Sequence, residues 1–138
     1  MVTLLCMIGK VTAQDLNAYK WKNRILFVMA NNKDSEKLQQ QIAVFNQNVA
    51  GLKERNLVIY LVTPYEFAKY NAQTIDWKKS KGFFDAYKLK DTEMELILFG
   101  MDGQIKHRKY NVTSAIEIFV IIDGMPLRQS ELKNNNQN

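Results

Sequence analysis

Cysteine is nearly absent from this sequence: one residue in 138, Cys6, lies close to its start. A single cysteine excludes an intrachain disulfide framework and a Cys-x-x-Cys redox pair. If the chain is cut after Ala13, as argued below, no cysteine is left to act as a nucleophile. Thiol chemistry is therefore not expected of the mature chain.

Histidine is equally scarce, since His107 is its one example. A catalytic triad needs a histidine between a nucleophile and a carboxylate, and a catalytic zinc usually has more than one imidazole ligand. The carboxylates between residues 85 and 95 form no paired motif, and the sequence contains neither a P-loop nor a Gly-x-Gly-x-x-Gly stretch. We therefore predict no catalytic residue, no metal site and no cofactor.

Long apolar runs are also missing, because none approaches the ~20 residues of a membrane-spanning helix. We expect a chain that is not transmembrane. Residues 2–8 are nevertheless apolar, and residues 11–13, Val-Thr-Ala, have the small-residue pattern of a signal-peptidase site, although no basic segment precedes them. We predict that residues 1–13 are a signal-peptide remnant and that the protein is exported to the periplasm, the envelope or the medium. If this segment is instead an N-terminal strand, the protein is cytoplasmic.

The composition of the remaining chain is that of an ordinary globular domain, with 46% hydrophobic and 24% charged residues. We predict one domain over residues 14–132 and a disordered polar tail over residues 133–138. Nineteen Lys and Arg residues against fourteen Asp and Glu residues give a formal net charge of +5. The basic residues are scattered, so we expect no sequence-specific binding of nucleic acid, but weak attraction to polyanions is compatible with the charge.

The first half of the domain predicts a strand, a helix and a second strand. Residues 24–30 and residues 57–62 are short, nearly continuous apolar runs, typical of strands buried on both faces. Between them, Asp34 or Ser35 provides the helix N-cap. The helix stripe that follows recurs at three- and four-residue steps: Leu38, Ile42, Phe45, Val49 and Leu52. Two such strands joined by a helix must be parallel.

Residues 95–109 predict an antiparallel hairpin. An apolar strand is followed by Gly100, Asp102 and Gly103, which supply the positive-φ residues that a tight turn needs. The return strand has interleaved polar residues, which suits an exposed edge.

The order of elements predicts the fold class. Residues 65–81 have no clean period, residues 82–90 predict the end of a second helix, and residues 114–124 predict a closing helix. The β-α-β unit, the hairpin and the closing helix together predict a mixed α/β, thioredoxin-like fold with a four-stranded sheet flanked by helices. A ferredoxin-like order fits worse, because no strand follows the last helix.

The loop after the first strand is the first candidate binding site. Thioredoxin-like enzymes keep their reactive cysteine there, at a helix N-terminus that lowers the pKa of its thiol. This sequence has Asn31, Asn32 and Lys33 in that loop, which we take as candidate binding residues. Ser35 follows as the expected cap rather than as a nucleophile. Residues 91–94 replace the cis-proline that usually precedes the hairpin.

Three basic residues form the second candidate site: Lys106, Arg108 and Arg128. They could gather around an acidic ligand, since Arg can form a bidentate contact with a carboxylate, sulfate or phosphate. Alternatively, the charges on residues 106 and 108 protect an edge strand from unwanted pairing. For Arg108 we favour a structural role, in which it ties the hairpin to the last helix through Asp123 or Glu131.

Residues 19–26, 100–108 and 122–128 together resemble the domain-of-unknown-function family numbered 4174. The resemblance covers residues 15–131 and implies a bacterial thioredoxin- or peroxiredoxin-like fold, often exported, with no established activity. It also implies a relationship to modules of vertebrate sushi-repeat and equarin-type matrix proteins. The positions that match the family motifs are Arg24, Asp102, Lys106, Arg108, Met125, Pro126 and Arg128.

These observations favour an exported, non-catalytic thioredoxin-like module that binds a protein or an acidic ligand. Two alternatives stay open: a vestigial thiol oxidoreductase or peroxidase, and a basic protein of the envelope or matrix that binds polyanionic glycans.

The export hypothesis predicts a mature N-terminus at Gln14. Intact-mass measurement of protein from its native host should show that residues 1–13 have been removed, because signal peptidase cuts after the small residue at position 13. A mass that retains Met1 would refute this prediction.

Overall fold

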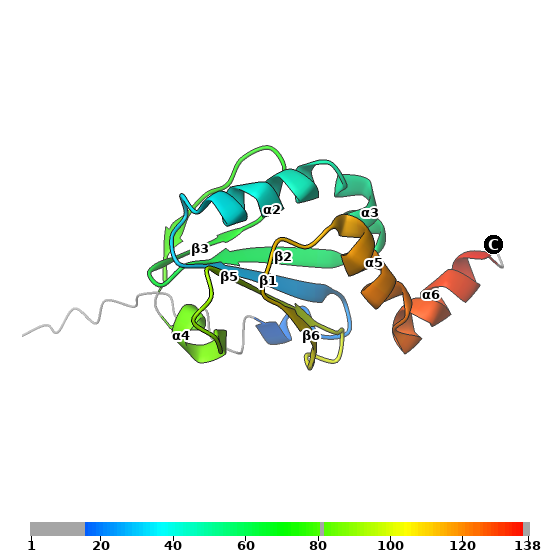
Figure 1. The fold of residues 1–138 in the computed structure, drawn as a ribbon. Coiled ribbons are helices and arrows are strands. Elements are labelled where there is room, and N and C mark those ends of the chain that lie inside the picture. The colour runs from blue at the N-terminus through cyan, green and yellow to red at the C-terminus, as the bar shows by residue number, and fades with distance from the viewer. Residues whose placement is uncertain (1–15, 81, 137–138) are drawn as a thin grey trace, which may run out of the picture.

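The structure is a computed structural model that describes residues 16–80 and 82–136 (Figure 1). Its strands form one six-stranded sheet in the order β4-β3-β2-β1-β5-β6. The strands are β1 Arg24–Ala30, β2 Leu57–Val62, β3 Glu66–Lys69, β4 Lys78–Lys79, β5 Met94–Phe99 and β6 Ile105–Lys109. The helices are α2 Glu36–Asn46, α3 Val49–Glu54, α4 Phe83–Tyr87, α5 Ala115–Asp123 and α6 Pro126–Asn136.

Strand β1 is the centre of the sheet, and all seven of its residues are buried. It pairs in parallel with β2, Phe27 opposite Tyr60, and antiparallel with β5, Phe27 opposite Ile97. The β5–β6 hairpin is also present, closed by Gly103 at φ +79°. These pairings confirm the predicted β-α-β unit and hairpin.

The predicted number of four strands is wrong, since the sheet has six. The two additional strands, β3 and β4, lie within residues 65–81, where the sequence shows no period. They have four and two residues, and β4 is fully exposed. Strands this short carry too few alternating positions for a pattern to appear, so their pairing depends on the neighbouring β2.

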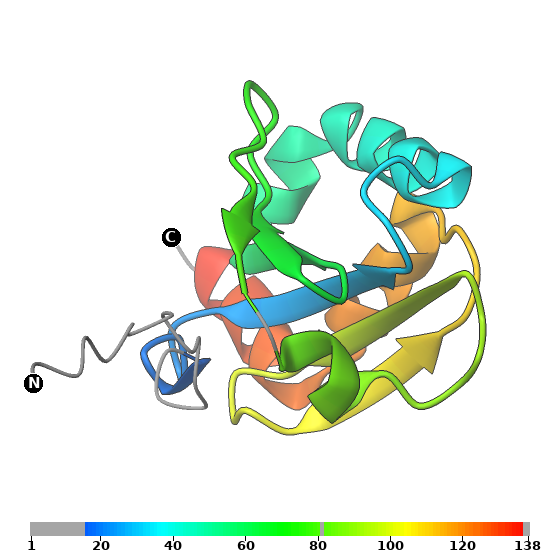
Figure 2. The same cartoon turned by 90° about the vertical axis from the view of Figure 1, so that its left-hand side faces the viewer.

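Helices cover the two faces of the sheet unequally (Figures 1 and 2). Helices α2, α3 and α5 pack on one face around Leu26, Val28 and Ile59. Helix α4 and the turn that starts at Leu16 cover the other face, whose core contains many aromatic rings. The rings around Phe27 meet edge to face, with centroids 5.0–6.1 Å apart.

The long predicted helix after Ser35 is two helices in the structure. Ser35 caps α2 as expected, since its Oγ accepts from the Leu38 N–H at 3.5 Å. The chain then breaks at residues 47–48 before α3 begins. Gly51 of α3 is explained by packing, because a Cβ there would lie 2.6 Å from the Phe119 ring of α5.

The end of the chain differs from its prediction. Ser114 caps α5 as expected, its Oγ accepting from the Glu117 N–H at 3.2 Å, and α5 ends before Gly124. A further helix, α6, then begins at Pro126 and continues to Asn136. Proline fits the first turn of a helix because its missing N–H has no partner to lose there. Residues 133–136 of the predicted disordered tail are therefore helical, while residues 1–13, the predicted signal segment, and residues 137–138 lie outside the described residues.

A cluster of ion pairs joins four elements beside the N-terminal end of β1. Arg24 of β1 contacts Glu131 of α6 at 3.2 Å, and Arg128 of α6 contacts Glu54 of α3 at 2.9 Å. The Asp123 carboxylate, on α5, accepts from both Arg55 and Arg128. The cluster consists of three arginines and three carboxylates, so its formal charges balance: Arg24, Arg55, Arg128, Glu54, Asp123 and Glu131.

Arg108 has a different partner from the two predicted for it. Its Nη1 donates to Glu95 Oε1 at 2.8 Å and to the Tyr87 carbonyl at 3.0 Å, so it ties the hairpin to α4 rather than to the last helix. Glu95 is fully buried, and its other oxygen accepts from the Leu89 N–H. Asp123 and Glu131 pair with other arginines instead, so the predicted tie between the hairpin and the last helix is wrong: ion pairs of Arg24 and Arg128 join the last helix to β1 and α5.

Removing the Arg108 charge should destabilise the fold. Arg108→Met leaves the buried Glu95 carboxylate without its cation, and we expect a loss of about 2–3 kcal/mol, less than for a fully buried pair because Arg108 is partly exposed. Arg108→Lys should cost only about 1 kcal/mol, since both bonds come from one nitrogen that an ammonium can partly replace. Urea unfolding measures both values, with Lys109→Arg as the control that should be unchanged. Equal midpoints for all three variants would show that Arg108 is a free surface charge.

Asp123 should make the stability of the fold sensitive to acid. Hydrogen bonds from Arg55, and to a lesser degree from Arg128, hold the pKa of Asp123 below its usual value against the opposing effect of burial. Because the pKa is lower in the folded than in the unfolded state, the stabilisation is complete above about pH 4 and is lost as the pH falls through the folded pKa.

Asp123→Asn should therefore lower the free energy of unfolding at pH 7 and flatten its decrease below about pH 4. Urea titrations at a series of pH values measure this effect. Asp91→Asn, at an exposed carboxylate without an ion pair to the described residues, is the matched control. An unchanged pH slope in the Asp123 variant would contradict the assignment.

Candidate functional site

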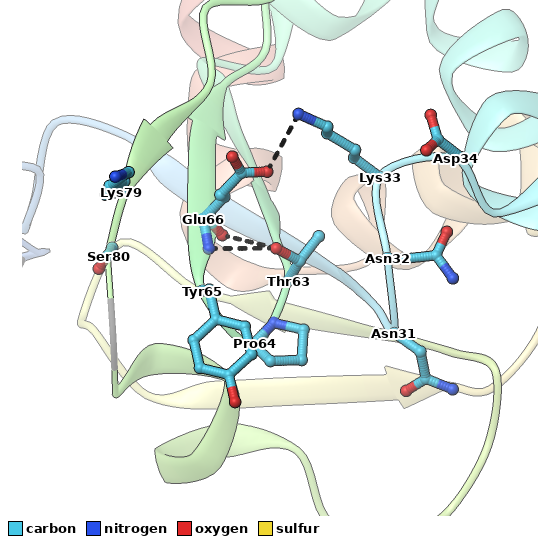
Figure 3. A pocket seen from close by; sticks show the side chains of 10 residues that line it. All are labelled: Asn31, Asn32, Lys33, Asp34, Thr63, Pro64, Tyr65, Glu66, Lys79 and Ser80. Atoms are coloured by element: carbon cyan, nitrogen blue, oxygen red, sulfur yellow. Dashed lines mark hydrogen bonds and ion pairs between the residues drawn. The ribbon is translucent and has the colours of Figure 1, made fainter.

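A cleft of about 530 Å³ lies at the carboxyl ends of β1 and β2 (Figure 3). We call it the edge cleft. It is lined by the loop after β1, by the turn between β2 and β3, and by the end of β4: Asn31, Asn32, Lys33, Asp34, Thr63, Pro64, Tyr65, Glu66, Lys79 and Ser80. The carboxyl ends of neighbouring parallel strands are where open α/β sheets generally bind ligands.

The β2–β3 turn forms one wall of the edge cleft, and its shape is fixed by Thr63. The Thr63 hydroxyl accepts from the Glu66 N–H at 3.1 Å and lies 3.2 Å from the Glu66 carbonyl, to which it donates. The Thr63 N–H donates to the same carbonyl at 2.9 Å. The Ser80 N–H donates to the Tyr65 carbonyl at 2.9 Å, which fastens the end of β4 to the turn. The wall is therefore held by backbone bonds that do not depend on a ligand.

The other wall is the loop from Asn31 to the α2 N-cap. Figure 3 shows Lys33 reaching across toward Glu66, with which it forms an ion pair at 3.5 Å, while Asn32 and Asp34 point away from that pair. The Asn31 and Asn32 amides make no hydrogen bond to the described part of the chain. They remain free to bind a ligand.

The charged side chains of the edge cleft are electrically balanced. Lys33 and Lys79 offset Asp34 and Glu66 in formal charge. Tyr65 is 70% exposed, so its ring face is open for stacking. No group of three or more metal-binding side chains occurs within residues 16–80 and 82–136, and no helix in this part is long and apolar enough to cross a bilayer. The cleft suits a ligand held by the Asn31 and Asn32 amides and by the face of the Tyr65 ring.

The structure separates the two sets of predicted binding residues. Asn31, Asn32 and Lys33 line the edge cleft, whereas Lys106 and Arg108 lie on β6, the opposite edge strand, and Arg128 lies on α6. Within that set, Lys106 pairs with Asp102 at 2.7 Å. As described above, Arg108 pairs with Glu95, and Arg128 is 1% exposed inside the ion-pair cluster.

Sequence reasoning missed the wall made by the β2–β3 turn and by β4. A signal was available for part of it, since Thr63, Pro64 and Tyr65 directly follow the predicted second strand. Because parallel neighbours end at the same edge of a sheet, these residues had to lie near Asn31. Lys79 and Ser80 had no such signal, because β4 was not predicted.

Comparisons with known proteins place this fold. The model of a family described as a domain of unknown function (DUF4174) matches residues 15–131. A reduced 2-Cys peroxiredoxin of Plasmodium vivax superposes with a TM-score of 0.60 at 16% identity, covering 83% of this chain and 84% of that one. The mitochondrial 2-Cys peroxiredoxin of Plasmodium falciparum gives 0.54 at 10% identity, with 78% of each chain covered. The search of curated proteins found no match.

At such low identity the peroxiredoxins show the fold and nothing more, and they confirm the predicted thioredoxin-like class. The family match covers most of the sequence and confirms the resemblance seen in its motifs. The chain therefore belongs to the DUF4174 family of domains of unknown function.

Proposed function

We propose that this protein is an exported, non-catalytic module that binds a polar ligand or a partner segment in the edge cleft. One observation carries the proposal. The cleft is open at the end of β1, where the loop consists of Asn31, Asn32, Lys33 and Asp34 and contains no sulfur. The fold thus keeps a place for a ligand without the atom that thiol chemistry requires there.

The residue at the helix N-terminus beside the cleft favours a binding role over thiol chemistry. A thiol peroxidase or oxidoreductase reacts through a thiolate, which such a helix end stabilises. Here the corresponding residue is Ser35, whose oxygen is engaged with the Leu38 N–H as an N-cap. A serine hydroxyl does not form sulfenic acid or a disulfide, so it cannot replace the thiol in redox chemistry. The one cysteine of the sequence, Cys6, lies outside the described residues.

The side chains of the edge cleft indicate what kind of ligand it would hold. The Asn31 and Asn32 amides can each donate and accept, and Tyr65 offers a flat apolar face. This combination suits a ligand with several hydroxyl or amide groups, such as an extended peptide or a sugar. An acidic ligand would use Lys79, which has no ion pair to the described residues.

Export is supported by the apolar stretch and the Val-Thr-Ala pattern before residue 14. The family resemblance implies a relationship to matrix-protein modules, which points the same way. It also favours the alternative function, the binding of polyanionic glycans, as do the net charge of +5 and the exposed lysines of β4. Retention on heparin that collapses with modest salt would favour this alternative, and flow-through at low salt would exclude it.

The non-catalytic role predicts no turnover in assays of insulin reduction and peroxide consumption by the full chain. The physical reason is the missing thiolate at the end of β1. Cys6→Ser is the matched control, because it removes the only sulfur that could act as a thiol. Turnover retained by this variant would reveal a different catalytic group, and turnover lost in it would identify Cys6 as the nucleophile. Either result would overturn the proposal.

A further inference from the structure

A second cleft, of about 310 Å³, lies at the opposite end of β1 from the edge cleft. We call it the hairpin cleft. It is bordered by the turn before β1, by the β5–β6 hairpin and by the first turn of α6. The lining residues that matter here are Trp21, Arg24, Met101, Lys106, Met125 and Leu127. Its volume is at the small end for a ligand site, so it suits a single large side chain rather than a cofactor.

Trp21 is the feature that sets this cleft apart. Its φ is +67°, a left-handed conformation that is rare for a bulky residue. The backbone around it holds it there: its N–H donates to the Met101 carbonyl at 2.6 Å, and the N–H groups of Lys22 and Asn23 donate to the Tyr19 carbonyl. The result is an indole that is 63% exposed at the rim of the cleft. Strained conformations of this kind cluster at binding and active sites, which makes Trp21 a candidate binding residue.

The walls of the hairpin cleft are apolar and adaptable. Met101 and Met125 contribute flexible thioether side chains, and Leu127 is 45% exposed. Methionine adjusts its shape to different apolar partners, and tryptophan is among the residues most often found at the centre of protein interfaces. These walls fit a leucine- or phenylalanine-sized side chain of a partner.

The charges around the cleft indicate the chemistry of that partner. The ion pairs already described neutralise Arg24 and Lys106. Lys20 and Lys22 flank Trp21 in sequence, are exposed, and have no ion pair to the described residues. Lys20 Nζ lies 5.8 Å from the centre of the Trp21 ring. The indole at the rim of the cleft is therefore next in sequence to two lysines without an ion pair to the described residues, and their positive charge complements a negatively charged segment.

Arg24 supplies a second, independent indication. Within residues 16–80 and 82–136, one buried side-chain nitrogen or oxygen lacks a hydrogen-bond partner, and it is Arg24 Nε, in a residue that lines this cleft. Buried N–H groups are nearly always paired in folded proteins. A carbonyl or carboxylate of a bound segment that reached this nitrogen would satisfy it.

We infer that the hairpin cleft binds an acidic segment of a partner protein, which inserts one large apolar side chain between Trp21, Met101 and Leu127. Carboxylates on both sides of that side chain then face Lys20 and Lys22. This site is distinct from the edge cleft and does not depend on the function proposed for it.

Fluorescence anisotropy with labelled heptapeptides tests the inference on the full chain. The peptides have the sequence Asp-Glu-Asp-X-Asp-Glu-Asp, where X is Leu, Phe, Trp or Ala. We expect at least one peptide with a large apolar X to bind at least tenfold more tightly than the Ala peptide, with affinity decreasing as salt rises. Trp21→Ala and Leu127→Ala should each weaken this binding at least fivefold.

Two further variants test the contribution of charge and the location of the binding site. The double variant Lys20→Glu with Lys22→Glu should lose the acidic peptides and prefer their lysine-flanked counterparts. Tyr65→Ala removes an equally exposed ring from the edge cleft and should leave peptide binding unchanged. Circular dichroism shows whether each variant is folded. If Trp21→Ala does not fold, Leu127→Ala still tests the apolar wall of the cleft.

The inference is overturned if no peptide binds, if the Ala peptide binds as tightly as the others, or if folded Trp21→Ala and Leu127→Ala variants bind normally. A loss of binding in Tyr65→Ala would move the site to the edge cleft and equally contradict it. None of these outcomes bears on the redox assays that test the proposed function.

Discussion

The ion pairs between Arg24, Arg128 and their carboxylates determine how strand β1 and helix α6 meet. Arg24 is the first residue of β1 and Arg128 lies in the last helix, and both are 1% exposed. A guanidinium can be buried this deeply only when carboxylates and carbonyls replace its water. Loss of one partner leaves an uncompensated buried charge, at a cost of about 3–5 kcal/mol in comparable cases. Strand β1, α3, α5 and α6 are consequently held in one arrangement.

Holding β1 in this way also positions both candidate sites. The strand is buried along its whole length, so its two ends are the places where the central layer approaches the surface. The edge cleft opens at the Ala30 end, where β1 and β2 finish together. The hairpin cleft opens at the Arg24 end, beside the turn that presents Trp21. One strand thus supports two surfaces, one with balanced charged side chains and amides, the other lined by methionine, leucine and tryptophan.

The fold and its chemistry are separable in this protein. The sheet and helices superpose on peroxiredoxins over most of the chain, yet the loop at the end of β1 has amide and charged side chains. The packing that builds the sheet involves Phe27, Ile97 and their neighbours, none of which takes part in thiol chemistry. A scaffold stabilised by its core can therefore keep its shape while the residues at a strand end change, and function has to be argued from those residues.

The sequence by itself determined β1, β2, the hairpin and the start of α5, because apolar runs, Gly103 and the Ser114 cap act over a few neighbouring residues. It also located one wall of the edge cleft, at Asn31 and Lys33. Only the tertiary structure decided the rest: the edge strands β3 and β4, helix α6, the pairing of Arg108 with Glu95, and the position of Trp21 beside Leu127. The edge strands are too short to show a period, and the other features depend on contacts between elements, which no local period encodes.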